Sequence, residues 1–382
     1  MQFSEFKKII ALMKRASKKD QSGSYDVVHF GSGVIGVPSS TGWSVSFNAD
    51  IEHNDEFGVT FASLNLITST KAPAGSDMSV RVSDDTATFS IGEVSVAIPV
   101  VTDRYHEAVE LVGEDTHPVW MHLPDSTKFS AAVSNAVKAF SFYSAAKLPA
   151  EAEVVHICTC DMPGDLSDHQ LLVIAVDSRN IFMYEEPTYL ARYSADRSHE
   201  VNSVYRNDSV LVHRTDAAKF NGLLAAKDVK MQVGKNNVFV VAEDRRILFP
   251  IEISKMYAPT DSLIKFIDGL EFERDLITLH TDASLRKLLA SSATYGPHIL
   301  FRFREDGKSS VFFGIDRRTG DFVSEHELEA DVDKSVGILA PSAFLSKVWT
   351  FMDNDILIRF NSKFTMLRSG GVTVVASTRS DR

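Results

Sequence analysis

The chain has 382 residues, of which 44% are hydrophobic and 24% charged, with a formal net charge of −11. This composition predicts a globular protein of two or three domains and excludes fibrous and disordered classes. No apolar run approaches the ~18 residues of a membrane-spanning helix, and residues 1–20 lack the apolar core of a secretory signal. The only two cysteines, Cys158 and Cys160, give no disulfide framework, so we expect a cytoplasmic protein.

The first third of the chain predicts a helix followed by strands. Apolar residues of 1–19 repeat at helical spacing. Residues 31–36 match G-x-G-x-x-G, but Pro38 and Gly42 follow, so the helix that a dinucleotide site needs cannot open there. We therefore expect a glycine-rich hairpin turn. A second helix-like stretch, 59–71, precedes the alternating segment 79–100, which predicts a hairpin with polar turns.

The middle third repeats this plan. Residues 126–147 predict a helix with Asp125 or Ser126 as its N-cap. His156, Cys158 and Cys160 alternate onto one face of a strand, but structural zinc sites pair two such units and no second pair exists. We interpret them as half-buried strand residues, neither metal ligands nor a thiol nucleophile with a base.

The pattern then occurs a third time. Helix-like stretches at 214–227, 281–295 and 341–352 alternate with strands, and residues 79–100, 230–252 and 357–376 resemble one another as strand, polar turn, strand, turn and strand. Thr281 or Asp282 is the expected N-cap of the stretch that follows it. The sequence therefore predicts an α+β fold of three repeats, at 1–118, 119–258 and 259–382.

Charge is segregated between the two kinds of segment. The six helix-like stretches together carry +13 in a chain of −11, so the remainder carries −24. A positive helical surface on an acidic protein is typical of contact with nucleic acid.

No constellation of residues predicts catalysis. Carboxylates fall in turn-like segments, where Asp is favoured for backbone reasons. Arg245-Arg246 and Arg317-Arg318 are interpreted as solvated strand ends. Phe140, Phe142 and Tyr143 are interpreted as core residues, not as a stacking platform for bases. We expect no enzyme, no metal and no cofactor.

The chain resembles the bacterial-type (beta) sliding clamp, the processivity factor of a replicative DNA polymerase. Residues 171–184, "LLVIAVDSRNIFMY", resemble the family's strand, turn and strand, with Asp177 at the position of the turn aspartate. Residues 234–237, 256–259 and 372–378 resemble further family segments. The family ends in Met-Pro-Met, whereas this chain has Ala376-Ser377-Thr378 and four more residues, so a divergent, phage-encoded member would fit.

The resemblance implies three clamp-like domains, each with two helices packed on antiparallel sheets, and a ring of two chains around duplex DNA. It implies as partners a DNA polymerase and a clamp loader, in a bacterial or phage-infected cell. The DNA-facing candidates are the basic residues of the helix-like stretches: Lys7, Lys8, Lys14, Arg15, Lys18, Lys128, Lys138, Lys219, Arg286, Lys287 and Lys347.

The resemblance also implies a pocket for a short apolar peptide of the partner proteins. Its expected walls are Ile157, Asp177, Arg179, Ile181, Tyr257, Ser342, Val374, Val375 and Ala376. The alternative is a β-rich structural or binding protein, such as a viral particle component, that forms no ring. That alternative does not predict six basic helices.

Overall fold

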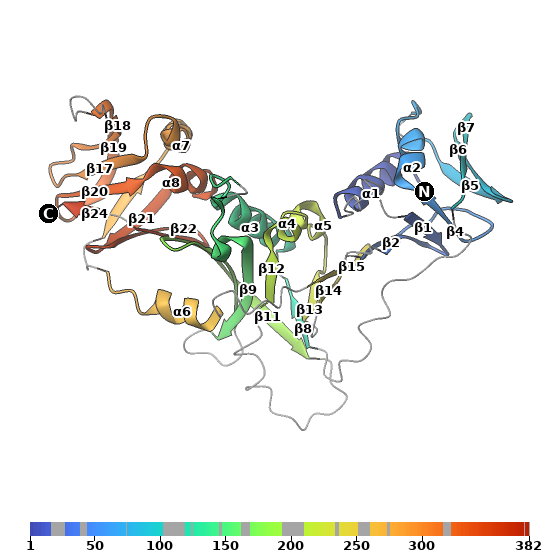
Figure 1. Ribbon diagram of the computed structural model, residues 1–382, viewed down its shortest axis with the longest axis horizontal. Coiled ribbons are helices and arrows are strands. Elements are labelled where there is room, and N and C mark those ends of the chain that lie inside the picture. The colour runs from blue at the N-terminus through green and yellow to red at the C-terminus, as the bar shows by residue number, and fades with distance from the viewer. Residues whose placement is uncertain are drawn as a thin grey trace, which may run out of the picture. The chain divides into compact units, whose positions relative to one another are not determined.

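The fold is seen in a computed structural model (Figure 1). The structure describes the following residues: 1–16, 27–38, 44–73, 75–101, 119–123, 125–144, 147–161, 169–192, 210–233, 237–250, 260–272, 276–315, 322–377 and 379–381. They divide into two compact units. The first comprises Met1–Ser130, Tyr189–His199 and Lys219–Ile251, and the second comprises Ala131–Thr188, Glu200–Ala218 and Glu252–Arg382.

Among its described residues, the first unit contains three helices besides the start of a fourth. These are α1 (Phe3–Ala16), α2 (Phe61–Thr68), α5 (Phe220–Leu223) and the beginning of α3 (Ser126–Ala139). Its strands are β1 (Val27–Gly31), β2 (Val34–Pro38), β3 (Ser44–Asn48), β4 (Phe57–Thr60), β5 (Met78–Ser83), β6 (Thr86–Ile91), β7 (Val94–Pro99), β8 (Val119–His122), β13 (Lys230–Val233), β14 (Asn237–Val241) and β15 (Arg245–Pro250). The end of β11 (Asn180–Arg192) also belongs to this unit.

The second unit is built in the same way. Its helical elements are the end of α3, η3 (Ala150–Glu153), α4 (Arg214–Ala217), α6 (Thr260–Asp268), α7 (Ala283–Ala290), η5 (Ser292–Thr294), α8 (Ser342–Val348) and η6 (Trp349–Phe351). Its strands are β9 (Val154–Asp161), β10 (His169–Val176), the start of β11, β12 (Val210–His213), β16 (Ile277–His280), β17 (His298–Phe303), β18 (Ser309–Ile315), β19 (Phe322–Val332), β20 (Val336–Pro341), β21 (Asp355–Phe360), β22 (Phe364–Ser369), β23 (Val372–Ser377) and β24 (Arg379–Asp381).

Local sequence explains where several elements begin and turn. Asp125 accepts a hydrogen bond from the backbone of Lys128, and Asp282 accepts one from Leu285, so both are N-caps as expected. Gly33 has a φ of +73° in the turn that joins β1 to β2, which confirms the hairpin interpretation of the glycine-rich loop. The expected helix over 214–227 is two short helices, α4 and α5, and α6 is a helix that the sequence patterns do not predict.

Each unit contains one long antiparallel sheet, and the two sheets have the same strand order. In the first unit the order is β4-β1-β2-β3-β15-β14-β13-β8-β11. In the second it is β12-β9-β10-β11-β23-β22-β21-β16-β19. Each sheet therefore joins strands of one sequence repeat to strands of the next, through β3–β15 and through β11–β23.

Two smaller sheets remain, one at each end of the chain. The first unit holds β5-β6-β7, and the second holds β24-β20-β17-β18-β19. Within the described residues, β7 pairs only with β6, and residues 322–328 of β19 pair only with β18. These are the strands that correspond to β23 and β11 in the long sheet of the second unit.

Alternation along the strands builds the cores. In the first unit the buried rings of Phe6, Phe30, Phe57 and Phe89 pack together, with Phe30 and Phe57 stacked at 4.5 Å between centroids. In the second unit Trp349 is fully buried and packs against Phe301. The α+β prediction is confirmed, and among the described residues no helix is long and apolar enough to span a membrane.

Candidate functional site

The basic candidates of the first unit lie on α1 and beside α5. Lys8 and Arg15 are exposed, and the Arg15 guanidinium lies close to Gly222, where an added Cβ would be 3.2 Å from its nitrogen. Lys219 is part-buried next to α5. Arg15 and Lys219 therefore come from neighbouring helical segments, while Lys18 lies outside the described residues.

Two further lysines of α1 bind partners in or just after α2. Lys7 donates to the carbonyl of Thr70 at 3.3 Å and lies 4.3 Å from the ring centroid of Phe3. Lys14 donates to the amide oxygen of Asn65 at 3.2 Å. These contacts orient both ammonium groups, so a ligand would compete with existing hydrogen bonds there.

The remaining candidates lie on α3, α7 and α8. Lys138 and Lys287 are exposed, and Lys347 is half-buried on α8. Lys128 forms an i,i+3 ion pair with Asp125 at 3.5 Å, and Arg286 donates to the carbonyl of Met352 at 3.0 Å. Exposed lysines without a rigid local partner suit loose, water-bridged contact with a phosphate backbone.

The second unit also contains a cavity of about 570 Å³. The turn between β10 and β11, the segment after α3, the start of α8 and the end of β23 all contribute to it. Its lining residues are Phe142, Tyr143, Arg179, Asn180, His298, Leu339, Pro341, Ala343, Phe344 and Ser377. Aromatic rings and a few polar groups in one concave site are typical of ligand pockets.

Asp177 holds the turn that forms one wall of the cavity. Its carboxylate is 4% exposed and accepts hydrogen bonds from the backbone of Arg179 at 2.6 Å and of Asn180 at 2.7 Å. It also accepts from the hydroxyl of Tyr143 at 3.0 Å. Burial, together with the adjacent Asp177 charge, raises the pKa of Tyr143 to about 12, so this hydroxyl stays protonated and donates.

Asn180 is held by the same turn. Its side-chain nitrogen donates to both Asp177 oxygens, at 3.2 and 3.0 Å, which fixes the orientation of the amide. Its Oδ1 is buried and has no hydrogen-bond partner within the described residues. A buried acceptor without a partner costs free energy, so this oxygen is a local cost of the turn geometry.

The residues expected to form the pocket are found in three places. Arg179 is exposed at the cavity, with Asp177 beneath the same turn. Ile157, Ser342, Val374 and Ala376 are buried, and the Ser342 hydroxyl donates to the carbonyl of Gly296. Ile181 and Val375 belong to a buried cluster against which α6 packs. Tyr257 lies outside the described residues, and the pocket assignment stays a prediction.

Several cavity residues were not expected from the sequence. Phe140 is core, as expected, but Phe142 and Tyr143 are part-buried at the cavity wall. The sequence "FSFY" places three aromatics in four residues, and this aromatic density was the available signal. His298 and Leu339 have no local signal, because long-range strand pairing brings them to the site.

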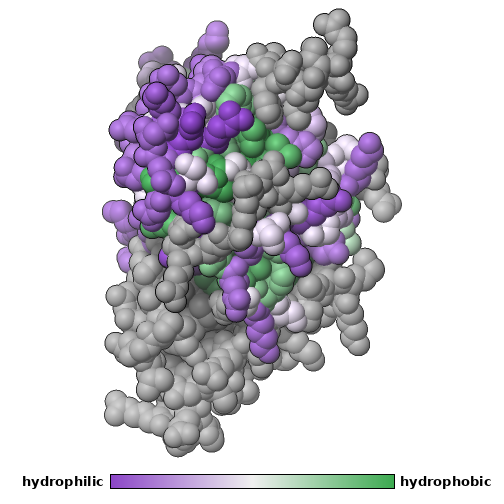
Figure 2. Space-filling model, turned by 90° about the vertical axis from the view of Figure 1, so that its left-hand side faces the viewer, coloured by the Kyte–Doolittle hydropathy of each residue, from purple (hydrophilic) through white to green (hydrophobic). Residues whose placement is uncertain are grey.

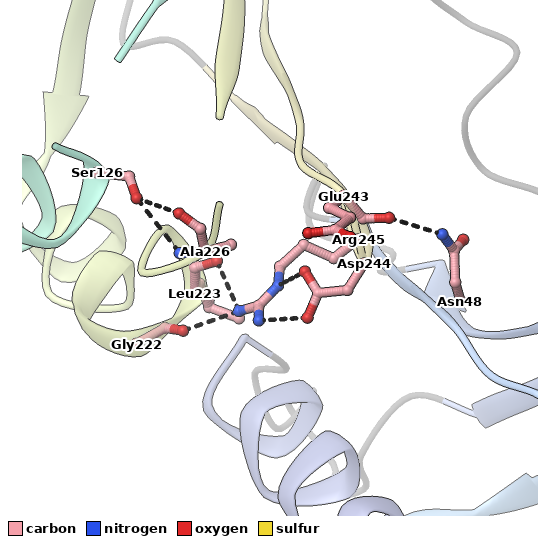
Figure 3. A network of polar contacts seen from close by, with 8 residues as sticks. All are labelled: Asn48, Ser126, Gly222, Leu223, Ala226, Glu243, Asp244 and Arg245. Carbon is pink, nitrogen blue, oxygen red and sulfur yellow. Dashed lines mark hydrogen bonds and ion pairs between the residues drawn. The ribbon is translucent and has the colours of Figure 1, made fainter. Parts of the chain in front are cut away.

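A polar network fixes the β3–β15 junction of the first unit (Figure 3). Arg245 is 7% exposed and forms a bidentate ion pair with Asp244 at 2.8 and 2.7 Å. It also donates to the carbonyls of Gly222 and Leu223, both at 3.0 Å, and its guanidinium lies 5.0 Å from the ring of Phe47. The interpretation of Arg245 as a solvated strand end is therefore wrong, because burial comes with a full set of partners. Arg317-Arg318 lies outside the described residues.

The network includes the adjacent strand and the start of α3. Asn48 donates from its side chain to the carbonyl of Glu243 at 3.0 Å, and Ser126 donates to the carbonyl of Ala226 (Figure 3). Within the described residues, no group of three or more His, Cys, Asp or Glu side chains is placed to hold a metal ion.

Comparisons with known proteins agree with this architecture. No protein-family model and no curated protein matches the sequence. Among solved structures, the Caulobacter crescentus beta sliding clamp is similar with a TM-score of 0.71 at 15% identity, covering 99% of this chain and 98% of that one. The Pseudomonas aeruginosa sliding clamp bound to griselimycin gives 0.72 at 13% identity, with the same coverage.

A third similar structure carries a peptide. The Helicobacter pylori beta clamp bound to a DNA ligase peptide gives a TM-score of 0.71 at 10% identity, again covering 99% and 98% of the two chains. The chain therefore has the fold of the bacterial beta sliding clamps over nearly its whole length.

Proposed function

We propose that this protein is a sliding clamp, a processivity factor that encircles duplex DNA and tethers a DNA polymerase without catalysing a reaction. Its three domains are 1–118, 119–258 and 259–382, and two chains form the ring. The observation that supports this most directly is the incomplete third sheet. Two long sheets of identical order occur in the chain, and the strands of a third are present as two separate halves.

The two halves complement each other between copies. In the complete sheets, β3 pairs with β15 and β11 pairs with β23. By the same rule β19 of one chain pairs with β7 of another, and two such junctions close a ring of two chains. Closure also covers two strand edges that would otherwise be exposed to aggregation.

Matched hairpins set the expected register at this junction. Val94 follows the β6–β7 turn as Val372 follows the β22–β23 turn. Counted through the strand pairings from His213, just before α4, and from Pro341, just before α8, Ser324 on β19 takes the position of Phe182 on β11. Because Phe182 lies opposite Val374, we expect Ser324 opposite Val96.

This register is tested by cysteine cross-linking. We expect Val96→Cys combined with Ser324→Cys, in a Cys158→Ser, Cys160→Ser background, to form covalent dimers on mild oxidation. The matched control pairs Ser324→Cys with Leu66→Cys, a position 60% exposed on α2. Equal cross-linking of the two pairs would exclude this junction.

Retention on DNA then depends on topology and not on affinity. The proposed lumen residues are the exposed and half-buried basic side chains of α1, α3, α7 and α8, which make loose phosphate contacts, so that sliding stays fast. A polymerase held by the ring meets the primer end at a high effective concentration, which makes its rebinding intramolecular.

The cavity is the proposed partner site. An apolar peptide of a DNA polymerase or clamp loader would place side chains against Phe344 and Phe142, with the exposed Arg179 available for a polar contact. We propose that the protein works in the cytoplasm of a bacterial or phage-infected cell, where replicating DNA is found.

The deciding experiment measures mass and retention together. Light scattering at micromolar concentration should give twice 42.2 kDa, about 84 kDa. Protein loaded on nicked circular DNA should stay bound in high salt and dissociate when the DNA is linearised. A monomer that shows the same retention on circular and linear DNA would exclude the sliding clamp function.

A further inference from the structure

Helix α6 covers one face of the β11–β23 junction. Its partly buried Leu263 and Ile267, with Leu270 just after the helix, pack against a buried cluster on that face. The cluster contains Cys158, Leu172, Ile174, Val176, Ile181, Met183 and Val375, with Phe364 and Met366 at its margin. The cluster draws on strands from both sides of the junction.

The other face of the same strands carries the helices that follow β20. Phe182, next to Ile181 on β11, packs edge-on against Phe351 of η6, with ring centroids 6.0 Å apart. Successive strand residues point to opposite faces. In Figure 1, α6 lies on one side of these strands, and α3, α7 and α8 lie on the other. The position of α6 is therefore separate from the basic helices.

The surface beneath α6 includes two residues assigned to the partner pocket. Ile181 and Val375 lie opposite each other across the junction, and both belong to the cluster under α6. Their exposed fractions are 5% and 2%. A partner peptide therefore cannot reach them while α6 is in place.

Helix α6 is held by less completely buried side chains than α8 on the other side of the strands. Phe344, Leu345 and Val348 of α8 are fully buried, whereas Leu263 and Ile267 of α6 are only partly buried. Phe266 is 46% exposed and touches Phe364 by its edge. A helix of nine residues is not stable alone, so its stability depends on this packing. Segments with few buried contacts open at low free energy.

The surroundings of α6 also limit which ligands suit the site. Among the residues coloured in Figure 2, apolar areas are bordered by hydrophilic side chains. Arg179, two residues before Ile181, is exposed, while the Asp177 carboxylate is buried and hydrogen-bonded. An apolar segment that carries an acidic residue fits this combination.

We propose that α6 is a displaceable lid, and that a short apolar segment with an acidic residue, from a partner protein, takes its place on Ile181 and Val375. This proposal rests on the clamp function only for the identity of the partner. In the closed state the chain's own helix occupies the site. Partner binding therefore has to compete with an intramolecular ligand at high effective concentration.

Hydrogen exchange of the unmodified protein gives the first test. We expect the backbone amides of α6 to exchange at least tenfold faster than those of α8. Equal protection of the two helices would mean that α6 opens only with the whole unit, and this would overturn the proposal.

The thiol of Cys158 gives a second, site-specific test. It is 4% exposed and belongs to the cluster under α6, so its reaction with a thiol reagent in a Cys160→Ser background reports opening of the lid. We expect Ile267→Asp to accelerate the reaction at least tenfold. Lys265→Asp, on the exposed face of α6, should leave it within twofold. If Ile267→Asp does not fold by circular dichroism, Ile267→Ala replaces it, with an expected threefold to tenfold acceleration. Equal rates in wild type and the folded variant would refute the lid.

A synthetic peptide tests the vacated site without DNA. The probe is the lid itself, residues 260–272 with a fluorescent label, and its binding is measured by anisotropy. We expect at least tenfold tighter binding to the Ile267→Asp protein than to wild type. Equal affinity for the two proteins would overturn the proposal. Because no DNA is present, equal affinity would not count against the sliding clamp function. Conversely, a failure of DNA retention would not count against the lid.

Discussion

Replacement of Arg245 tests the network that joins β15 to β3 and α5. Arg245→Met keeps much of the apolar length of the side chain but removes its charge and all its donors. Two carbonyl oxygens, those of Gly222 and Leu223, then lose their hydrogen bonds, and Asp244 loses its ion partner. Hydrogen bonds from a charged donor contribute about 1.5–3 kcal/mol each, while an ion pair with a half-exposed carboxylate contributes at most about 1 kcal/mol.

We therefore expect the free energy of unfolding of the first unit to fall by about 3 kcal/mol, since methionine still covers Phe47 and water reaches part of the network. The measurement is urea denaturation followed by circular dichroism at pH 7.5. Arg246→Met is the matched control, because Arg246 is the next residue but is exposed. We expect its effect to stay below about 1 kcal/mol. Equal stability of Arg245→Met and wild type, or an equal decrease in both variants, would refute the assignment.

Three further predictions concern other parts of the chain. Gly371→Ala should destabilise the second unit by about 1–3 kcal/mol in the same assay, because its Cβ would lie 2.6 Å from the backbone oxygen of Glu185, whereas Gly75→Ala meets nothing within 4 Å. Equal effects would contradict the steric argument. Burial lowers the pKa of His156 to about 4 in the folded protein, whereas its value in the unfolded chain is near 6.5. As the pH falls, the unfolded state therefore binds the proton first. The free energy of unfolding should decrease by about 3 kcal/mol between pH 6.5 and pH 4. His156→Gln should flatten this dependence, and an unchanged pH profile in the variant would refute the cause. The last prediction neutralises four basic residues together: Lys8, Lys138, Lys287 and Lys347. The salt dependence of DNA association, measured by anisotropy on a short duplex, should fall by about one unit of slope for each phosphate that is no longer neutralised. An unchanged slope would exclude these residues from the lumen.

Local features of the fold were predictable from sequence. The turn at Gly33 and the caps at Asp125 and Asp282 depend on residues within three positions of each other, so short patterns reveal them. The repeats were recognisable because segments 79–100, 230–252 and 357–376 share the same order of alternating strands and polar turns.

Features that depend on distant contacts were not predictable. Arg245 looked like a solvated strand end, since its carbonyl partners lie more than 20 residues earlier in the chain. Helix α6 has apolar residues at positions 263, 266, 267 and 270, but such a short segment is helical only because the β11–β23 surface supports it. The cavity brings together five separate stretches of the chain, and no single stretch carries its signature.

Backbone hydrogen bonds pair the strands at each junction between repeats. The backbone N–H of Asn48 donates to the carbonyl of Asp244 at 2.9 Å at one junction. At the other, the N–H of Glu185 donates to the carbonyl of Gly371 at 2.8 Å. In both cases the acceptor lies in a turn of the other repeat. Backbone pairing selects poorly among sequences, because every residue except proline offers the same donor and acceptor.

In a cell that contains a second ring protein of this fold, hybrid rings would assemble unless side chains at the strand edges discriminated against them. The part of β19 that pairs only with β18, residues 322–328, has two carboxylates, those of Glu325 and Glu327, while β7 has no charged residue. An acidic edge that meets an uncharged one tolerates its own partner and repels a foreign acidic strand. The identity of the ring would then reside in a few rim charges, and exchanging them should be enough to allow mixing of two subunit populations.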